Sequence, residues 1–315
     1  MRAKSAPINP LGDGVKKRQC RAAALASIIA GSISFISLQA AAQGVYTTLD
    51  YGTSGTFLTG IRGPNIVGNY IIPGTTSTGG LLYNTTTGIW TPFPTATGSG
   101  ANFPNATGSS PYGPNFGNPN GVLRTVGSYI TSASSPYNLS YLYDGSAAPQ
   151  SQLTTLVYPS ASGNPTLETI AHSTFGNQVV GNYDTRLATG NAFIYNITNG
   201  TYVTNNVPGA LSTTAYGIYG NLIAGGYSTV GPGGGLGIGS AYIYNQTSGV
   251  WTTYNHPGAI ETHFEGISGG GQAGSYNLVA NWTGVDGQVH ASVLHIDALG
   301  NQTWIDYSFP GSVLT

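Results

Sequence analysis

Short apolar segments separated by Gly- and Asn-rich turns run along the chain from about residue 43 to its end. The clearest segment is a five-residue motif that ends in Gly-x-Tyr. It occurs five times, and the glycines of successive copies are 59, 54, 44 and 49 residues apart. The five copies are Ile66–Tyr70, Thr125–Tyr129, Val179–Tyr183, Ile223–Tyr227 and Gln272–Tyr276. The segment Leu278–Trp282 fits the last copy as well, with Trp282 in the Tyr position. Recurrence at this period is typical of a repeat architecture.

Three further segments accompany each copy, and we label the four a, b, c and d in chain order, with Gly-x-Tyr as b. An a segment such as Ala215–Ile218 precedes b, and an aliphatic–Tyr pair such as Ile243-Tyr244 forms c. Segment d begins with an aromatic or apolar residue and has Pro six positions later, as in Trp251 to Pro257. Gly and Asn lie between a and b and between c and d, where they accept the positive φ of tight hairpins. Each repeat is therefore predicted to be a four-stranded antiparallel meander.

Five such meanders predict an all-β protein, a five-bladed β-propeller. The strands of about six residues are shorter than the ~9–11 residues of an outer-membrane barrel strand, and units of this length match a propeller blade. An open β-solenoid or a two-sheet sandwich remains the alternative. Segments of type d occur six times, because Tyr46–Gly52 matches d ahead of the first full repeat, with Gly in the Pro position. We expect one terminal d segment to close the ring and the other to be an addition.

The c segments of the later repeats resemble the bacterial extracellular repeats known as the HAF family. A His-Ala-Phe-like step before an aliphatic–Tyr pair, together with an Ile-Val-Gly-x-Tyr strand, carries the resemblance. The matching segments are Ala192–Tyr195, Ala241–Tyr244 and His290–His295. The resemblance covers nearly all of the chain after residue 42 and implies a secreted repeat protein, but it implies no catalytic residue.

Residues 1–42 are predicted to be a signal peptide. Six basic residues precede an apolar stretch from about Ala22 to Leu38, and Ala40–Ala42 supplies small residues for cleavage. The apolar stretch falls short of a membrane span of ~20 residues, although a retained N-terminal anchor is the alternative. We therefore expect a secreted protein, periplasmic or extracellular, with a single propeller domain over residues 43–315 and no membrane insertion after cleavage.

Charge is scarce beyond residue 42, where Arg62, Arg124 and Arg186 stand against nine acids and Lys, Cys and Met are absent. Without a basic patch to neutralise phosphates, nucleic-acid binding is disfavoured. The single cysteine, Cys20, lies in the leader, so no disulfide is expected. No organic cofactor is expected either, and a divalent metal is left open.

Acidic and histidine side chains gather on two a segments. Glu168 and Glu261 both stand fifteen residues before the Tyr of their b segment, and His172 and Glu265 both stand eleven before it. Because alternate side chains of a strand share one face, Glu261, His263 and Glu265 are predicted to lie together. Carboxylates and imidazoles in a recessed site can act as general acid and base or bind a divalent metal. The alternative is that all five are solvated polar residues at the mouth of the ring.

Four other residues are candidate ligand contacts. Tyr216 occupies the His172 and Glu265 position of the fourth repeat. Trp282, with Asp286 nearby, could stack on a sugar ring if it is exposed, although a packing role is equally compatible. With this strand order, the b-to-c and d-to-a connections share one face of a propeller, and we predict that this face carries the ligand. Arg186 is the only basic residue in these connections, and an ion pair with Asp184 is its simpler explanation.

These features favour a secreted or surface-associated binding protein that recognises an extracellular polymer such as a glycan. The alternative is an extracellular hydrolase or lyase that acts on a polymer at the centre of the ring with Glu168, His172, Glu261, His263 and Glu265. A purely structural role in the cell envelope or matrix is the third class.

Overall fold

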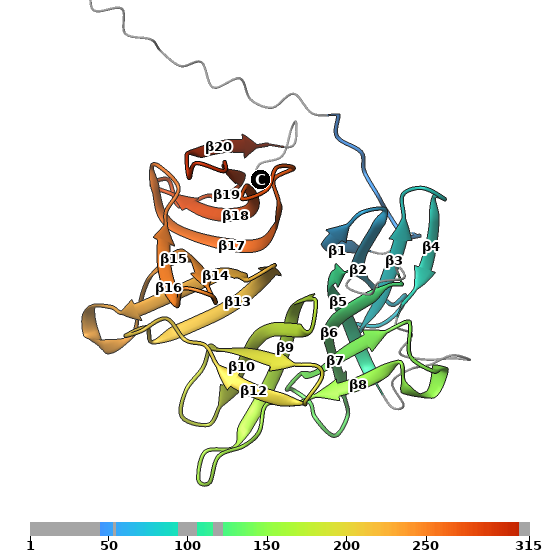
Figure 1. Ribbon diagram of the computed structural model, residues 1–315. Helices are drawn as coiled ribbons and strands as arrows, with labels where there is room; N and C mark the ends of the chain where they lie inside the picture. The colour runs from blue at the N-terminus through green and yellow to red at the C-terminus, as the bar shows by residue number, and fades with distance from the viewer. Residues whose placement is uncertain (1–44, 53–54, 94–105, 116–121, 309–315) are drawn as a thin grey trace, which may run out of the picture. The chain divides into compact units, whose positions relative to one another are not determined.

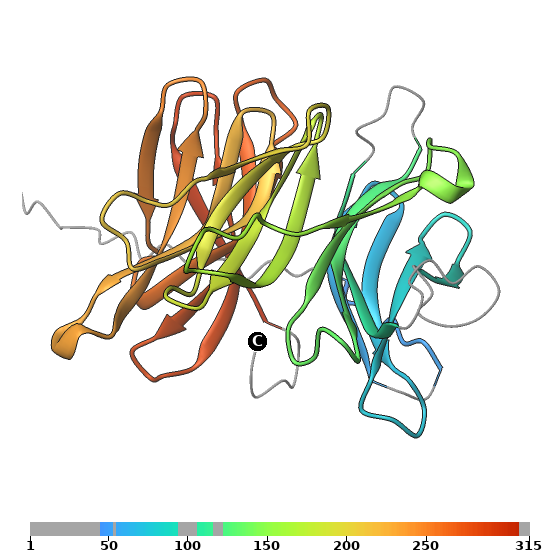
Figure 2. The same ribbon diagram turned by 90° about the horizontal axis from the view of Figure 1, so that it is seen from below.

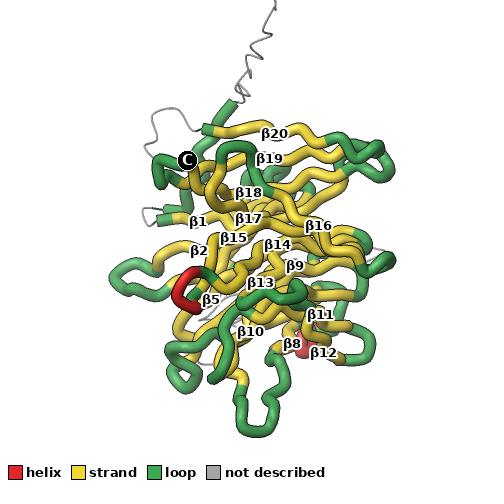
Figure 3. The backbone as a smooth tube through the Cα atoms, turned by 90° about the vertical axis from the view of Figure 1, so that its left-hand side faces the viewer, coloured by secondary structure: helices red, strands yellow, loops and turns green. Residues whose placement is uncertain are grey.

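The computed structural model describes residues 45–52, 55–93, 106–115 and 122–308. The predicted signal peptide lies outside these residues. More than half of the described chain is strand, and the rest is turns and loops with two short 3-10 turns (Figure 3). No helix among the described residues is long and apolar enough to cross a membrane.

The described residues form twenty strands, and consecutive groups of four form one sheet each. The strands are β1 (Thr56–Arg62), β2 (Asn65–Ile71), β3 (Thr78–Asn84), β4 (Ile89–Pro92), β5 (Ala106–Asn115), β6 (Arg124–Thr131), β7 (Leu139–Asp144), β8 (Leu153–Leu156), β9 (Thr166–Phe175), β10 (Gln178–Thr185), β11 (Asn191–Asn196), β12 (Thr201–Thr204), β13 (Ser212–Tyr219), β14 (Leu222–Val230), β15 (Leu236–Asn245), β16 (Val250–Tyr254), β17 (Ala259–Gly269), β18 (Tyr276–Gly284), β19 (Val289–Ile296) and β20 (Gln302–Tyr307). The 3-10 turns are η1 (Pro149–Ser151) and η2 (Pro232–Gly234).

Every sheet is an antiparallel meander in the order a-b-c-d, so the predicted repeat unit is confirmed. The five sheets succeed one another around a ring, from the blue first blade to the red fifth blade in Figure 1. The chain is therefore a five-bladed β-propeller, as predicted. Strands β1, β5, β9, β13 and β17 are the a strands, and Figure 2 shows the same ring from below.

The b strands of the first four blades carry a glycine where the backbone of the a strand approaches closely. A Cβ placed on Gly181 would collide with the carbonyl oxygen of Ile170, and one on Gly225 would collide with that of Thr214. Beside this contact the pairing register shifts by one residue, which is a β-bulge in the a strand. A bulge re-aims the side chain of the extra residue, so the glycine pattern determines which a-strand side chain leaves the regular alternation.

The tyrosine of the b strand reaches across strand c and forms a hydrogen bond with strand d. Its hydroxyl lies 2.8–2.9 Å from the Oγ1 of a threonine on strand d in the second, third and fourth blades. These pairs are Tyr129–Thr155, Tyr183–Thr204 and Tyr227–Thr253. The aromatic residues of the repeat are thus explained by packing and hydrogen bonding within each blade.

A second repeated contact forms the corner where strand d of one blade passes to strand a of the next. The N–H of the residue before Pro donates to a buried threonine hydroxyl on the following a strand. This bond joins Val207 to Thr213 at 3.1 Å and His256 to Thr262 at 3.0 Å. The residue before a proline is held extended, which directs its N–H to the new strand. We call this contact the corner bond.

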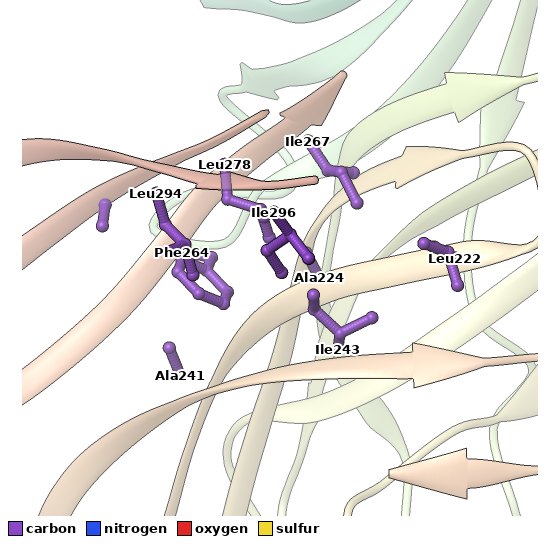
Figure 4. Packing of buried hydrophobic residues seen from close by; sticks show 10 residues of the cluster. Leu222, Ala224, Ala241, Ile243, Phe264, Ile267, Leu278, Leu294 and Ile296 are labelled. Atoms are coloured by element: carbon purple, nitrogen blue, oxygen red, sulfur yellow. The ribbon is translucent and has the colours of Figure 1, made fainter. Parts of the chain in front are cut away.

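Apolar side chains fill the interfaces between successive blades. Figure 4 shows the interface between the fourth and fifth blades, where Ala224 and Ile243 meet Phe264, Leu278 and Leu294. Similar clusters join the second blade to the third and the third to the fourth. The first and second blades are joined by polar contacts as well, for example Asn69 Nδ2 donating to Ser110 Oγ at 2.8 Å.

The structure decides two points that the sequence left open. The sixth d segment, Tyr46–Gly52, is not a strand, because β20 supplies strand d of the fifth blade. In the fifth blade the b element is Leu278–Trp282 and not Gln272–Tyr276, since Ala280 pairs with Phe264 as Gly225 pairs with Ala215. The a-to-b hairpin of this blade is longer than the corresponding hairpin of the fourth blade. On the neighbouring strands β18 and β19, the apolar residues Leu278 and Leu294 pair with each other.

Replacing Gly225 with Ala is expected to destabilise the protein by about 1–3 kcal/mol, because the new methyl group meets backbone rather than a movable side chain. Gly266→Ala is the matched control, since a Cβ there meets nothing within 4 Å. Urea unfolding of both variants measures the difference. Equal stability of the two variants would contradict the close-approach explanation.

Candidate functional site

One side chain from each a strand stands at an equivalent position of the ring, and in every blade except the second it is the extra residue of a β-bulge. Each is the residue that follows the partner of the b-strand glycine, or of Ala280 in the fifth blade. We call these residues the inner row, and they are Thr59, Tyr112, His172, Tyr216 and Glu265. The sequence alignment had equated His172, Tyr216 and Glu265, and the pairing registers place them at equivalent positions.

Neighbouring members of the inner row contact one another across the blades. The ring centroids of Tyr112 and His172 lie 5.4 Å apart, and those of His172 and Tyr216 lie 4.7 Å apart. Thr59 Oγ1 donates to the carbonyl oxygen of Pro111 at 2.5 Å, beside Tyr112. The inner row therefore runs as a continuous polar and aromatic surface over adjacent a strands.

Three members of the inner row, His172, Tyr216 and Glu265, have pKa values shifted toward their neutral forms. Burial lowers the pKa of His172 to about 4, and the hydrogen bond to Asn182 opposes this shift only in part. His172 Nε2 and Asn182 Oδ1 lie 2.7 Å apart. Because an amide oxygen only accepts, this contact places the imidazole hydrogen on Nε2.

Glu265 is reached by solvent but has protein on most sides. Loss of hydration raises the pKa of its carboxyl group, against the opposing effects of His263 and of a hydrogen bond from Asn281. Asn281 Nδ2 donates to Glu265 Oε1 at 3.2 Å. Burial, followed by the nearby Glu265 charge, raises the pKa of Tyr216. A carboxyl group with a raised pKa is a candidate general acid or base.

Glu261 and His263 form a separate pair on β17. His263 Nε2 lies 3.1 Å from Glu261 Oε1, and the His263 ring packs over Gly226 of β14 while its Nε2 faces Gly239 of β15. A Cβ on Gly239 would meet His263 Nε2 and Glu261 Oε1, and a Cβ on Gly226 would press on the His263 ring, so either substitution would displace the pair. This pair therefore faces the fourth blade.

Glu168 lies against the second blade. Its Oε1 accepts a hydrogen bond of 3.0 Å from Asn138 Nδ2, and no hydrogen bond or ion pair among the described residues joins it to Glu261 or Glu265. The five candidate catalytic residues thus divide into three groups, with Glu168 near Asn138, His172 and Glu265 in the inner row, and Glu261 with His263. Within the described residues, no three His, Asp or Glu side chains converge as metal ligands.

Trp282 stands in the Tyr position of the fifth b strand and is covered on both ring faces. It stacks on His256 at 3.9 Å and on His290 at 4.3 Å, and its Nε1 donates to Ser292 Oγ at 2.7 Å. Ser292 Oγ donates in turn to Asp306 Oδ1 at 2.6 Å, and His256 Nε2 lies 3.0 Å from the same oxygen.

This network takes the place of the Tyr–Thr pairs of the other blades, because Asp306 and Thr204 occupy the same position of strand d. Sequence reasoning missed His256, Ser292 and Asp306. A sequence signal for His256 was available. In the equivalent corner Tyr158 precedes Pro159 and stacks on the b-strand Tyr183 at 3.6 Å, so the residue before Pro257 could be expected to stack on the residue in the b-strand Tyr position.

The two remaining candidates are exposed. Arg186 makes no ion pair with Asp184, and the Asp184 carboxylate instead accepts the Gly190 N–H at 2.7 Å. The proposed Arg186–Asp184 pair is therefore wrong, and the Arg186 side chain extends from the loop that follows β10. Asp286 lies in the turn between β18 and β19, where it accepts the Gln288 N–H at 3.0 Å and stands 3.7 Å from His290.

A cavity of about 250 Å³ lies beside Tyr112, between the first and second blades. Its lining consists mainly of small polar and tyrosine side chains, with Gly108 and Ile130, and contains no charged residue. Lining residues include Asn69, Thr78, Ser110, Tyr112, Ser128 and Asn138. These residues come from the ends of the blades where the b-to-c and d-to-a connections lie, which is the face the sequence had indicated.

The sequence matches no protein-family profile and no curated protein. By structure the chain is similar to a DUF4221 family member from Bacteroides vulgatus, with 10% identity, a TM-score of 0.40 and 82% of each chain covered. It is also similar to the β-propeller domain of the Trilobed protease from Pyrococcus furiosus, with 10% identity, a TM-score of 0.33, and 84% of this chain and 95% of that chain covered. The class defined by the strand topology is a five-bladed β-propeller.

Acidification is expected to destabilise the protein through His172. Its pKa of about 4 in the folded state lies below that of an unfolded histidine, about 6.5, so the unfolded state binds more protons between these values. This contribution is absent above about pH 6.5 and grows as the pH falls toward the folded-state value. Unfolding midpoints at pH 7.5 and 5 should therefore differ more in the wild type than in His172→Gln. An unchanged pH dependence in the variant would show that His172 does not carry the effect.

Proposed function

We propose that the propeller binds a neutral, hydroxyl-rich polymer such as a glycan on the face that carries its b-to-c and d-to-a connections. The observation that carries this proposal is the uncharged polar cavity beside Tyr112. Amide and hydroxyl side chains provide donors and acceptors for sugar hydroxyls, and tyrosine rings provide apolar faces for sugar C–H groups. A pocket without charge discriminates against phosphorylated or acidic ligands, because it offers no group to pair with them.

The polar groups of the cavity are positioned by contacts of their own. Asn69 donates to Ser110, and Asn138 donates to Glu168, so both amides are oriented before a ligand arrives. Tyr112 connects the cavity to the inner row through its contact with His172. Pre-ordered side chains reduce the entropy lost on binding, which favours recognition by this surface.

Secretion is part of the proposal and rests on the basic and apolar leader and on the resemblance to the HAF family. Mass spectrometry of the exported protein should give an N-terminus near Gln43.

Screening the protein against an array of neutral and acidic glycans tests the binding function. Asn69→Ala is expected to weaken binding of the selected glycan roughly tenfold, corresponding to the loss of about one well-placed hydrogen bond. Thr252→Ala, an exposed residue of β16, is the control and should bind as the wild type does. Binding that is unaffected by Asn69→Ala, or restricted to acidic glycans, would contradict the proposal.

A hydrolase or lyase acting on the same polymer is the second candidate. The observation in its favour is the raised pKa of Glu265, which lies near Tyr216, the residue whose ring contacts the neutral His172. In this case the bound glycan is cut, and Glu265→Gln abolishes the release of new reducing or unsaturated ends while binding persists. Glu261→Gln, on the separate pair, distinguishes the inner row from β17 as the location of the chemistry.

A further inference from the structure

The segment before the first blade has the sequence of an outer strand. Residues 45–52 read Val-Tyr-Thr-Thr-Leu-Asp-Tyr-Gly, and residues 250–257, which contain β16 and its corner, read Val-Trp-Thr-Thr-Tyr-Asn-His-Pro. The alternation and the pair of threonines are shared, and Tyr51 aligns with His256. In the structure β16 pairs with β15, whereas residues 45–50 belong to no strand.

The corner that follows this segment is nevertheless formed. Tyr51 N–H donates to Thr56 Oγ1 at 2.9 Å, which is the corner bond seen between Val207 and Thr213. The Tyr51 ring lies 4.9 Å from that of Tyr70, the b-strand tyrosine of the first blade. The connection into the first blade therefore has the same geometry as a connection from strand d of one blade to strand a of the next.

The blade that precedes the first in the ring is the fifth. The face of the fifth blade that would pack against the first blade is uncovered. Val279 is 51% exposed, whereas the equivalent residues of the other four blades, Val67, Val126, Val180 and Ala224, are completely buried by the blade that follows. On the first blade Leu58 and Ile61 are 44% and 67% exposed. No cluster of buried apolar residues joins the described parts of the first and fifth blades.

We propose that residues 45–50 are an alternative outer strand for β19, and that they replace β20 when the fifth blade packs against the first. Matching residue 46 to Trp251 and Trp304 places Thr47 opposite Val293, the position that Ile305 occupies in the present structure. The N-terminal segment then provides strand d of a blade whose other strands come from the C-terminal repeat. Ring closure buries Val279 against the first blade.

The strand that competes with β20 comes from the same molecule as β20. The corner bond at Tyr51 holds the segment at the first blade, beside the interface that it would complete. A tethered strand acts at a high effective concentration, so it competes with β20 without help from a second molecule. The two d segments thus alternate on one sheet edge, which gives an open and a closed form of the ring.

Engineered disulfides distinguish the two forms. The full-length chain with Cys20→Ser has no cysteine of its own. Adding Thr47→Cys and Val293→Cys reports the closed form, and adding Ile305→Cys and Val293→Cys reports the open form and serves as the folding control. Cα atoms paired across neighbouring strands are close enough for a disulfide.

The closed form predicts that oxidation joins residues 47 and 293 within a monomer, seen as a shift on a non-reducing gel and as a cross-linked peptide by mass spectrometry. Trp304→Gly, which weakens β20, should raise the yield severalfold. Disulfide-linked dimers would mean that the strand is donated to another molecule, and this would overturn the proposal. So would the absence of the 47–293 cross-link in the Trp304→Gly background while the 293–305 control forms.

Discussion

The corner bond is the interaction on which the arrangement of the blades depends. Each blade is a self-contained meander, so its hairpins alone say nothing about the position of the next blade. The N–H before the proline and the buried threonine hydroxyl join the outer strand of one blade to the a strand of the next, as at Val207–Thr213 and His256–Thr262. Since an unsatisfied buried N–H costs about 1–3 kcal/mol, this bond favours a single path for the chain. The apolar interfaces then pack on blades whose relative position is already restricted.

The inner row follows from the same repeated geometry. Where the b-strand glycine admits the a-strand carbonyl, the bulge turns one side chain out of the regular alternation, and packing no longer dictates its identity. Chemistry can therefore differ from blade to blade at these positions, which hold His172, Tyr216 and Glu265 in the last three blades. The fifth blade varies most, since it also replaces the Tyr–Thr pair by Trp282, Ser292 and Asp306.

The blades could be predicted from sequence because their signals are local. Gly-x-Tyr, the Asn- and Gly-rich hairpins and the spacing of Trp251 and Pro257 each report on neighbouring strands. The bulges could not be predicted, because a one-residue register shift leaves no mark in a strand pattern. Two segments fitted the fifth b strand, because a longer hairpin moved Ala280 into the glycine position. The cavity beside Tyr112 and the separation of Glu168 from Glu261 depend on contacts between blades, which spacing along the chain does not encode.

Amide hydrogen exchange at the corners is the most direct test of this account. The amides of Val207 and His256 should exchange as slowly as those inside strands, although both residues lie in connections. Thr213→Val should accelerate exchange at Val207, and Thr262→Val should accelerate it at His256, each without effect on the other corner. Fast exchange of both amides in the wild type, at the rate of exposed loops, would contradict the claim that the corner bond sets the path between blades.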